Sequence, residues 1–402
     1  MKVLVINTGS SSIKYQLFDL DGPTVMAAGL VERIGDSGSR LRHAGWPDTP
    51  DRRREHEREQ PIADHRAGMA LIAAALADPG HGVLGAADAV DGVGHRVVHG
   101  GEDFQAPALI DEAVLAGIRA NAPLAPLHNP ANLAGIEVAR ELFPDAPQVA
   151  VFDTAFHQTM PPHAFHYALP RRLYQQHHVR RYGFHGTSHA WVAAAAAGFL
   201  QRPPEQLNLV TLHLGNGASA TAIAGGRSVD TSMGLTPLEG LVMGTRSGDV
   251  DPAVHAFLAA QEGLSLAQID ELLNKHSGLK GLCGSGDLRD IERKAEDGDA
   301  DAALALEIYV YRIRKYVGAY WAVLGRVDAL VFTAGVGENS ATIRARVCDG
   351  LQGLGIQLDA VENGAAASGP RAIHAADSAA AVLVVPTNEE LAIAEQTREM
   401  IA

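Results

Sequence analysis

Two segments about 200 residues apart share one arrangement: a short apolar strand, a turn of small polar residues, and a second strand. The first covers residues 3–18 with its turn at residues 7–12, and the second covers residues 209–223 with its turn at residues 215–219. The second segment begins near the midpoint of the 402-residue chain. We therefore expect a duplicated architecture of two domains, each built around one of these hairpins.

Strands and helices alternate along the rest of the chain, which predicts an α/β protein. We expect further strands over residues 89–94, 149–152, 329–332 and 381–385, and helices over residues 67–77, 188–200, 302–324 and 389–400. Ser188 is the expected cap of the second of these helices. The segment 36–66 is dense in charged residues and proline, so we expect an exposed excursion with its histidines at the surface.

Composition excludes several classes of protein. The chain has 33 Lys and Arg against 47 Asp and Glu, a formal charge of −14, which argues against a general nucleic-acid-binding protein. Its two cysteines make no CxxC motif and no disulfide framework, and its longest apolar run, residues 190–200, is well short of the ~20 residues that span a bilayer. We expect a cytoplasmic protein with no membrane or nucleic-acid partner.

The two turns predict a site for phosphate. Main-chain N–H groups in a turn without bulky side chains, together with hydroxyls such as those of Ser10 and Ser12, form a concave anion site. Lys14 follows the first turn directly. The dipeptide Gly-Lys is absent, which excludes a Walker A loop, and no complete GxGxxG fingerprint occurs.

Arginines in loops of small residues predict an anionic reaction centre. Such loops occur at residues 94–96, 181–188 and 243–249, and Arg in this setting can bind an oxyanion with two hydrogen bonds. Asp153 and Glu389, at the ends of an expected strand and helix, suit a hard cation such as Mg²⁺. His185 and His189 have the i, i+4 spacing of a zinc site, but neither an HExxH context nor a cysteine partner accompanies them.

These segments together resemble the acetate kinase family over nearly the whole chain. The resemblance is carried by residues 7–14, 95–102, 125–132, 151–157, 181–189, 213–217, 231–249 and 387–390. It implies the duplicated ribonuclease-H-like fold of actin, Hsp70 and sugar kinases, with a nucleotide cleft between two domains, and a homodimer. The first domain would comprise residues 1–153 plus 390–402, and the second, residues 154–389, would carry most ATP contacts.

The resemblance also implies roles for individual residues. Asp153, His185 and Arg246 would be catalytic, and Asn7 and Glu389 would hold Mg²⁺, with Mn²⁺ as a plausible substitute. The carboxylate substrate would be bound by Arg96, with its methyl group among Val98, Leu127, Phe184 and Pro237. ATP would be contacted by Ser10, Ser12, Lys14, His213, Leu214, Gly215, Asn216, Gly217, Asp287, Leu288, Arg289, Gly335, Val336, Gly337, Glu338 and Asn339. The segment 277–289 departs from the family pattern, being about one residue shorter.

The implied reaction is reversible phosphoryl transfer from ATP to acetate, giving ADP and acetyl phosphate. A carboxylate acceptor with a pKa near ~4 is ionised at neutral pH and needs no general base. We therefore expect Asp153 to orient an arginine or the metal's water shell. Propionate kinase is the alternative within the family. A sugar or polyol kinase and an actin- or Hsp70-like nucleotide switch are the rival interpretations outside it.

Overall fold

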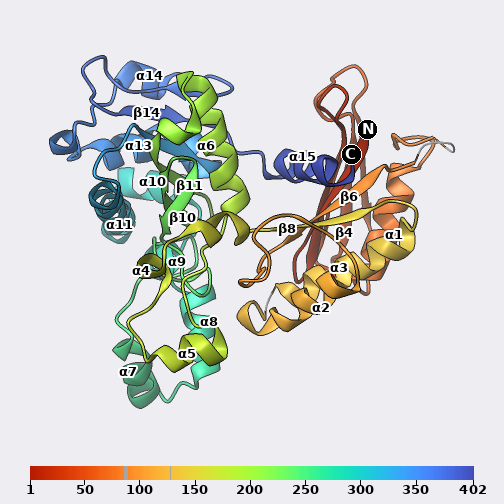
Figure 1. Cartoon of the computed structure of the whole chain (residues 1–402), viewed down its shortest axis with the longest axis horizontal. Coiled ribbons are helices and arrows are strands. Elements are labelled where there is room, and N and C mark those ends of the chain that lie inside the picture. The colour runs from red at the N-terminus through yellow and green to blue at the C-terminus, as the bar shows by residue number, and fades with distance from the viewer. Residues whose placement is uncertain (86–88, 127) are drawn as a thin grey trace. The chain divides into compact units, whose positions relative to one another are not determined.

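The computed structural model describes residues 1–85, 89–126 and 128–402 and divides the chain into two compact units. Unit 1 comprises Met1–Ala155 and Asn388–Ala402, and unit 2 comprises Phe156–Thr387. The expected boundaries were 153/154 and 389/390. Each unit contains one mixed β-sheet with helices packed on it (Figure 1).

Unit 1 is built on a sheet of strand order β5-β4-β3-β2-β1-β6-β8-β7. The strands are β1 (Lys2–Thr8), β2 (Ser12–Asp19), β3 (Thr24–Glu32), β4 (Arg40–Gly45), β5 (Arg54–Glu59), β6 (Gly92–Val97), β7 (Ala108–Leu109) and β8 (Gln148–Phe152). Strands β1 to β5 form an antiparallel meander, whereas β6 and β8 run parallel to β1. The carboxyl ends of β1, β6 and β8 therefore lie at one edge of the sheet, the usual place for a site in such sheets.

Alternating side chains of β1 build two cores on opposite faces of this sheet. Leu4 and Ile6 pack with residues of α1 and α3, whereas Val3 and Val5 pack with residues of α15. The helices of unit 1 are α1 (His65–Leu76), α2 (Glu112–Ala120), η1 (Ala122–Leu124), α3 (Asn129–Leu142) and α15 (Glu389–Ile401). The C-terminal helix α15 thus closes the second face of the N-terminal sheet, and both chain ends belong to unit 1 (Figure 1).

Unit 2 repeats the central part of this topology. Its strand order is β11-β10-β9-β12-β14-β13, with β9, β10 and β11 antiparallel and β12 and β14 parallel to β9. The strands are β9 (Asn208–Leu214), β10 (Ala218–Ala224), β11 (Arg227–Thr231), β12 (Ala329–Thr333), β13 (Arg371–Ala372) and β14 (Ala381–Val384). The order β3-β2-β1-β6-β8 in unit 1 matches β11-β10-β9-β12-β14 in unit 2, which is the expected duplication.

The helices of unit 2 cover its sheet, with α6 in one core and α11 packed along β9 and β10. They are η2 (Ala155–Thr159), which begins at the boundary, α4 (Pro162–Phe165), α5 (Arg171–His177), α6 (Gly186–Leu200), η3 (Pro204–Gln206), α7 (Ala253–Glu262), α8 (Leu266–Lys275), α9 (Gly278–Cys283), α10 (Leu288–Glu296), α11 (Ala300–Leu324), α12 (Ala334–Asn339), α13 (Ala341–Cys348), η4 (Gln352–Leu354) and α14 (Ala360–Gly364). No helix in the described residues is long and apolar enough to cross a membrane.

Three expectations from the sequence were wrong. The segment 36–66 is not a simple excursion, because β4 and β5 extend the sheet of unit 1 and His43 on β4 is buried. Ser188 does not cap α6, which begins at Gly186 after His185, so Ser188 lies inside the helix. Arg96 lies within strand β6 and not in a loop.

Candidate active site

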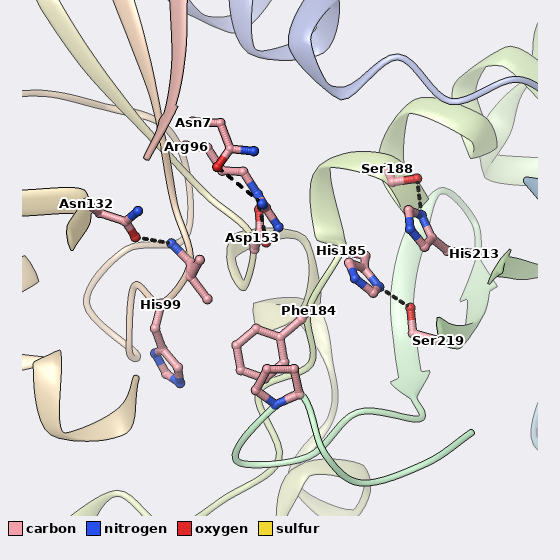
Figure 2. A network of polar contacts seen from close by, with 12 residues as sticks. Asn7, Arg96, His99, Asn132, Asp153, Phe184, His185, Ser188, His213 and Ser219 are labelled. Carbon is pink, nitrogen blue, oxygen red and sulfur yellow. Dashed lines mark hydrogen bonds and ion pairs between the residues drawn. The ribbon is translucent and has the colours of Figure 1, made fainter. Parts of the chain in front are cut away.

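In unit 1, three predicted residues meet where parallel strands end. Asn7 is near the end of β1, Arg96 is the penultimate residue of β6, and Asp153 follows β8 directly. Arg96 donates from Nε to both carboxylate oxygens of Asp153, at 3.0 and 3.2 Å, and from Nη2 to Oδ2 at 2.6 Å (Figure 2). Its Nη1 lies 3.4 Å from Oδ1 of Asn7. The ion pair holds the guanidinium plane in one orientation.

Burial and charge give this cluster its electrostatic character. Asp153 is 1% exposed and Arg96 is 23% exposed. Burial acts against the charged guanidinium, but the carboxylates of Asp153 and Glu389 outweigh it, and the pKa of Arg96 lies above its usual value. Burial, reinforced by Asp153 and opposed by Arg96, raises the pKa of Glu389 to about 7. The cluster therefore holds more carboxylates than Arg96 alone can neutralise.

Asn7 and Glu389 fit the Mg²⁺ that the family resemblance implies. Amide and carboxylate oxygens are the ligands this ion prefers, and the excess of negative charge at Glu389 favours a bound cation. Among the described residues, no group of three or more His, Cys, Asp or Glu is arranged to hold a metal. Mg²⁺ commonly takes only one or two protein ligands and fills its shell with water and phosphate, so the small donor set is no obstacle.

The first hairpin turn places Lys14 beside this cluster within unit 1. Lys14 on β2 lies opposite Asn7 on β1, and its Nζ forms an ion pair with Glu390. The turn is closed by a hydrogen bond from the Gly9 N–H to the Ser12 carbonyl at 2.8 Å, and Ser10 at its tip is exposed. These groups are accessible to an anionic ligand.

Two asparagines that received no predicted role fix the chain around Val98. Oδ1 of Asn132 accepts from the Val98 N–H at 3.1 Å (Figure 2). Its Nδ2 donates to the Thr8 carbonyl at 2.8 Å. Asn129 makes the same two-sided contact with the N–H and carbonyl of His99. Both asparagines lie in the first turn of α3, inside one of the segments that carry the family resemblance. Asn132 thus connects the ends of β1 and β6, and Asn129 holds the main chain at His99.

In unit 2, His185 lies at the start of α6 in a left-handed conformation, with φ 57°. Its Nδ1 is 2.9 Å from Oγ of Ser219, and its ring stacks on His213 at a centroid distance of 4.1 Å (Figure 2). His213 in turn contacts Oγ of Ser188 at 2.8 Å. Ser188 and Ser219 therefore orient the two rings.

Arg246 and His185 reach the same turn, residues 215–217 after β9. A Cβ built at Gly217 would lie 3.3 Å from Nε2 of His185 and 3.6 Å from Nη1 of Arg246. Nη1 of Arg246 also donates to the Pro237 carbonyl at 3.1 Å, which fixes the Arg246 side chain against its own loop. Two predicted catalytic groups and a predicted phosphate-binding turn are thus brought together within unit 2.

His157 and Arg181 support the neighbouring loops. His157 is fully buried between Ser228 and the Phe184 carbonyl, at 2.9 and 3.0 Å, and burial lowers its pKa to about 4. Arg181 donates to three consecutive carbonyls, residues 231–233, and pairs with Glu239 at 2.6 Å. These contacts secure the loop that carries Pro237.

A pocket of about 690 Å³ in unit 2 collects predicted ATP contacts from three separate segments. Its predicted lining residues are Gly215, Asn216, Asp287, Leu288, Arg289, Gly335, Val336 and Asn339. The segment 277–289 is therefore part of the pocket wall despite its departure from the family pattern. The size is within the range of small-molecule sites.

Some predicted residues lie elsewhere, and some lining residues were missed. His213, Leu214, Gly217, Gly337 and Glu338 are not among the lining residues, and Leu127 is outside the described residues. The missed lining residues are Gly244, Leu279, Gly286, Glu292 and Ser340. Glu292 lies one helical turn after Leu288 on α10, so helical spacing was a signal for it.

The two units define a class of protein. Each carries the same five-stranded order, and unit 2 adds a nucleotide-sized pocket beside a turn flanked by His185 and Arg246. This arrangement is that of a phosphotransferase with a duplicated ribonuclease-H-like fold.

Comparison with known proteins gives the family. The model of the acetokinase family matches residues 2–395. An acetate kinase from Syntrophobacter fumaroxidans is 56% identical over 402 residues, 100% of this chain and 97% of that protein. The crystal structure of Porphyromonas gingivalis acetate kinase matches with a TM-score of 0.94 at 46% identity, covering 100% of both chains. A propionate kinase structure from Francisella tularensis matches with a TM-score of 0.92 at 40% identity, covering 99% of both chains.

The chain belongs to the acetokinase family. It is a phosphotransferase that has a carboxyl group as acceptor.

Proposed function

We propose that the chain transfers the γ-phosphoryl group of ATP to acetate, reversibly, and that propionate is a poorer acceptor. The observation that carries the proposal is the buried Arg96–Asp153 ion pair. A guanidinium has five N–H donors. Asp153 occupies Nε and one N–H of Nη2, and Asn7 takes one N–H of Nη1. One N–H group of Nη1 and one of Nη2 therefore remain for an acceptor carboxylate.

Acetate is ionised at neutral pH and is itself the nucleophile. The reaction therefore needs charge stabilisation and not proton abstraction. Asp153 serves as the counter-ion that fixes Arg96 and has no role as a base. The pKa of Arg96 is raised in the pair, which keeps its positive charge at any working pH. Two anions must approach each other in this reaction, and cations that lower their repulsion lower the barrier.

ATP binds in the pocket of unit 2, with its phosphates toward the turn at residues 215–217. His185 and Arg246 flank this turn, and there they stabilise the charge of the transferring phosphoryl group. Ser219 orients His185, while the Pro237 carbonyl orients Arg246. Lys14, Ser10 and Ser12 bind phosphate oxygens from the first hairpin.

Asn7 and Glu389 would hold Mg²⁺, for which Mn²⁺ would substitute. When bound, the ion would neutralise phosphate charge. The surplus carboxylate charge around Glu389 supports this assignment.

Val98, Leu127, Phe184 and Pro237 would surround the methyl group of acetate. Val98 is 8% exposed and Phe184 is 2% exposed, so both positions are fixed by their surroundings. An added methylene in an apolar pocket changes binding by only ~1–3 kcal/mol, so we expect propionate to be used more slowly and not to be rejected.

The test is acyl phosphate formation. The protein is incubated with ATP, Mg²⁺ and acetate, propionate or glycerol in turn, and any acyl phosphate is trapped with hydroxylamine. We expect hydroxamate with acetate, less with propionate and none with glycerol. Hydroxamate from acetate no greater than in a control without acceptor would overturn the proposal, and equal rates with acetate and butyrate would overturn the pocket assignment.

We also propose a homodimer in the cytoplasm. Leu304, Tyr311 and Val323 are exposed apolar side chains on α11, which is the surface we expect a second copy to cover. Both cysteines are free, which suits a reducing compartment where ATP is available. Sedimentation equilibrium should give twice the chain mass of 42.3 kDa, and a monomer at micromolar concentration would contradict the dimer.

A further inference from the structure

A second pocket in unit 2, of about 530 Å³, adjoins the nucleotide pocket at Asn339. It is lined by two arginines, Arg344 and Arg371, and by a loop of small residues, 364–368. Glu338 and Asn339 of α12 complete one wall. The neighbouring helices α13 and α14 lie at the same end of the unit as β14 (Figure 1).

Arg344 is a buried charge without a carboxylate partner among the described residues. It is 1% exposed and donates only to uncharged oxygens: Nε to Oδ1 of Asn363, Nη2 to the Asn363 carbonyl, and Nη1 to two carbonyls of α12. Burial, reinforced by the nearby charge of Arg371, lowers the pKa of Arg344 to about 10. The guanidinium of Arg344 in the pocket wall is therefore not paired with a carboxylate of the described residues.

Arg371 on β13 has even fewer partners in the described part of the chain. Its Nη1 lies 3.5 Å from the Ala367 carbonyl, and its buried Nε has no hydrogen-bond partner. A buried donor left unsatisfied destabilises the folded protein. An unsatisfied buried donor is expected where the partner of the side chain is a ligand.

The loop adds main-chain donors. Within the described residues, the N–H groups of Ala366, Ala367 and Ser368 donate no hydrogen bond to another residue, and their side chains are too small to cover the pocket. Glu338 is the carboxylate in the lining, but its Oε1 accepts from the Thr387 N–H at 3.1 Å. Two guanidinium groups and a loop of open amides form a site for an oxyanion.

We propose that this pocket binds a small polyvalent oxyanion, a phosphate ester or a carboxylated phosphate of metabolite size, and that binding acts on the nucleotide pocket. The connection is α12. Arg344 holds the carbonyls of Gly337 and Glu338, while Gly335, Val336 and Asn339 of the same helix line the nucleotide pocket. Asn339 lines both pockets. An anion between the arginines relieves their repulsion and strengthens the hold of Arg344 on α12, so ATP binds more tightly.

The test is titration calorimetry of the whole protein saturated with Mg–ADP and acetate, which blocks phosphate binding at the substrate residues. Inorganic phosphate and 3-phosphoglycerate are the two probes, at constant ionic strength. Arg371→Gln should weaken binding by at least about tenfold, because one charge-assisted contact is lost. Arg227→Gln, an exposed arginine on β11, is the matched control and should bind as the unchanged protein does.

A second variant covers the case in which Arg371→Gln does not fold. Ala366→Glu at the exposed loop supplies a carboxylate of its own to the pocket, and it should abolish probe binding while leaving the fold intact. Equal probe binding in the unchanged protein and in either variant would overturn the site. No binding to the unchanged protein would overturn it as well.

The coupling has its own readout. Saturating probe should lower the KM for ATP by about fivefold in the unchanged protein, a typical coupling between sites, and should not change it in Arg371→Gln. Probe binding with an unchanged KM would overturn the link through α12. Because Arg371 lines this pocket and not the nucleotide pocket, the difference in probe heat between Arg371→Gln and the unchanged protein reports on this site whichever acceptor the enzyme phosphorylates.

Discussion

At the scale of the residue, buried side chains hold the reactive ones in place. Asp153 orients Arg96, Ser219 orients His185 and Asn132 fixes the main chain at Val98. Each supporting contact is a hydrogen bond between groups with fixed neighbours, so the geometry exists before a ligand arrives.

Buried histidines give the fold a pH dependence. His95 lies on β6 beside Arg96, its Nε2 is 2.7 Å from Oε1 of Gln148, and burial lowers its pKa to about 4. The unfolded chain, with a pKa near 6.5, takes up the proton first as the pH falls. The contribution of neutral, buried His95 to the free energy of unfolding is therefore fully present above about pH 6.5. About 3 kcal/mol of the free energy of unfolding is lost as the pH falls toward 4.

His95→Asn should therefore flatten the pH dependence of stability between pH 7.5 and 5, measured from urea unfolding midpoints. The exposed His177→Asn is the matched control and should leave the dependence unchanged. A dependence that is equally steep in His95→Asn would contradict the assignment.

At the scale of the element, the loops of the nucleotide pocket pack closely. Gly244 donates its N–H to the Asn216 carbonyl at 3.0 Å, and a Cβ at Gly244 would lie 2.3 Å from Oδ1 of Asn216. Gly244→Ala should displace the Asn216 side chain and raise the KM for ATP about tenfold, a loss of about 1.4 kcal/mol of binding.

Gly198→Ala is the control for this substitution. Gly198 lies within α6 and nothing stands within 4 Å of the position of its Cβ. It should leave the KM unchanged and stabilise the helix by about 0.5–1 kcal/mol. An unchanged KM in Gly244→Ala would show that the pocket is not the ATP site.

Local patterns predicted the two central hairpins and the longer helices of apolar period, but missed other elements such as β3 and α3 and the contacts between elements. The expected hairpins correspond to β1–β2 and β9–β10, and the expected helix 302–324 is α11, Ala300–Leu324. The edge strand β5 and its neighbour β4 were missed, because their charged, weakly alternating residues give no apolar period, and the pairing of β4 with β3 is a tertiary contact. The lining residues Gly244 and Leu279 were missed for the same reason, since their part in the pocket depends on contacts between loops distant in sequence.

At the scale of the whole molecule, a helix that follows the last central strand of each unit packs on the sheet of the other unit. The helix α6 follows β8 in sequence but packs on the sheet of unit 2, whereas α15 follows β14 but packs on the sheet of unit 1. Unit 1 is therefore incomplete without the last residues of the chain.

Removal of residues 388–402 should destabilise unit 1 and spare unit 2. Ile393 and Ala394 fill the core on one face of the first sheet, and their loss exposes Val3 and Val5. Limited proteolysis should then cut within residues 1–155 while residues 156–387 stay protected in the presence of ADP. Removal of Ala402 alone is the control, and equal protection of both units in the shorter protein would contradict the account.

Arg96 and Asp153 together supply oriented charge for the proposed reaction and no general base. The most direct measurement is the pH dependence of kcat for Asp153→Asn, with the binding of Mg–ATP followed in parallel. We predict a rate lowered by about 10²-fold, because the guanidinium is misplaced, with both limbs of the profile retained. Loss of one ionisation limb while Mg–ATP still binds normally would contradict it and make Asp153 a proton acceptor.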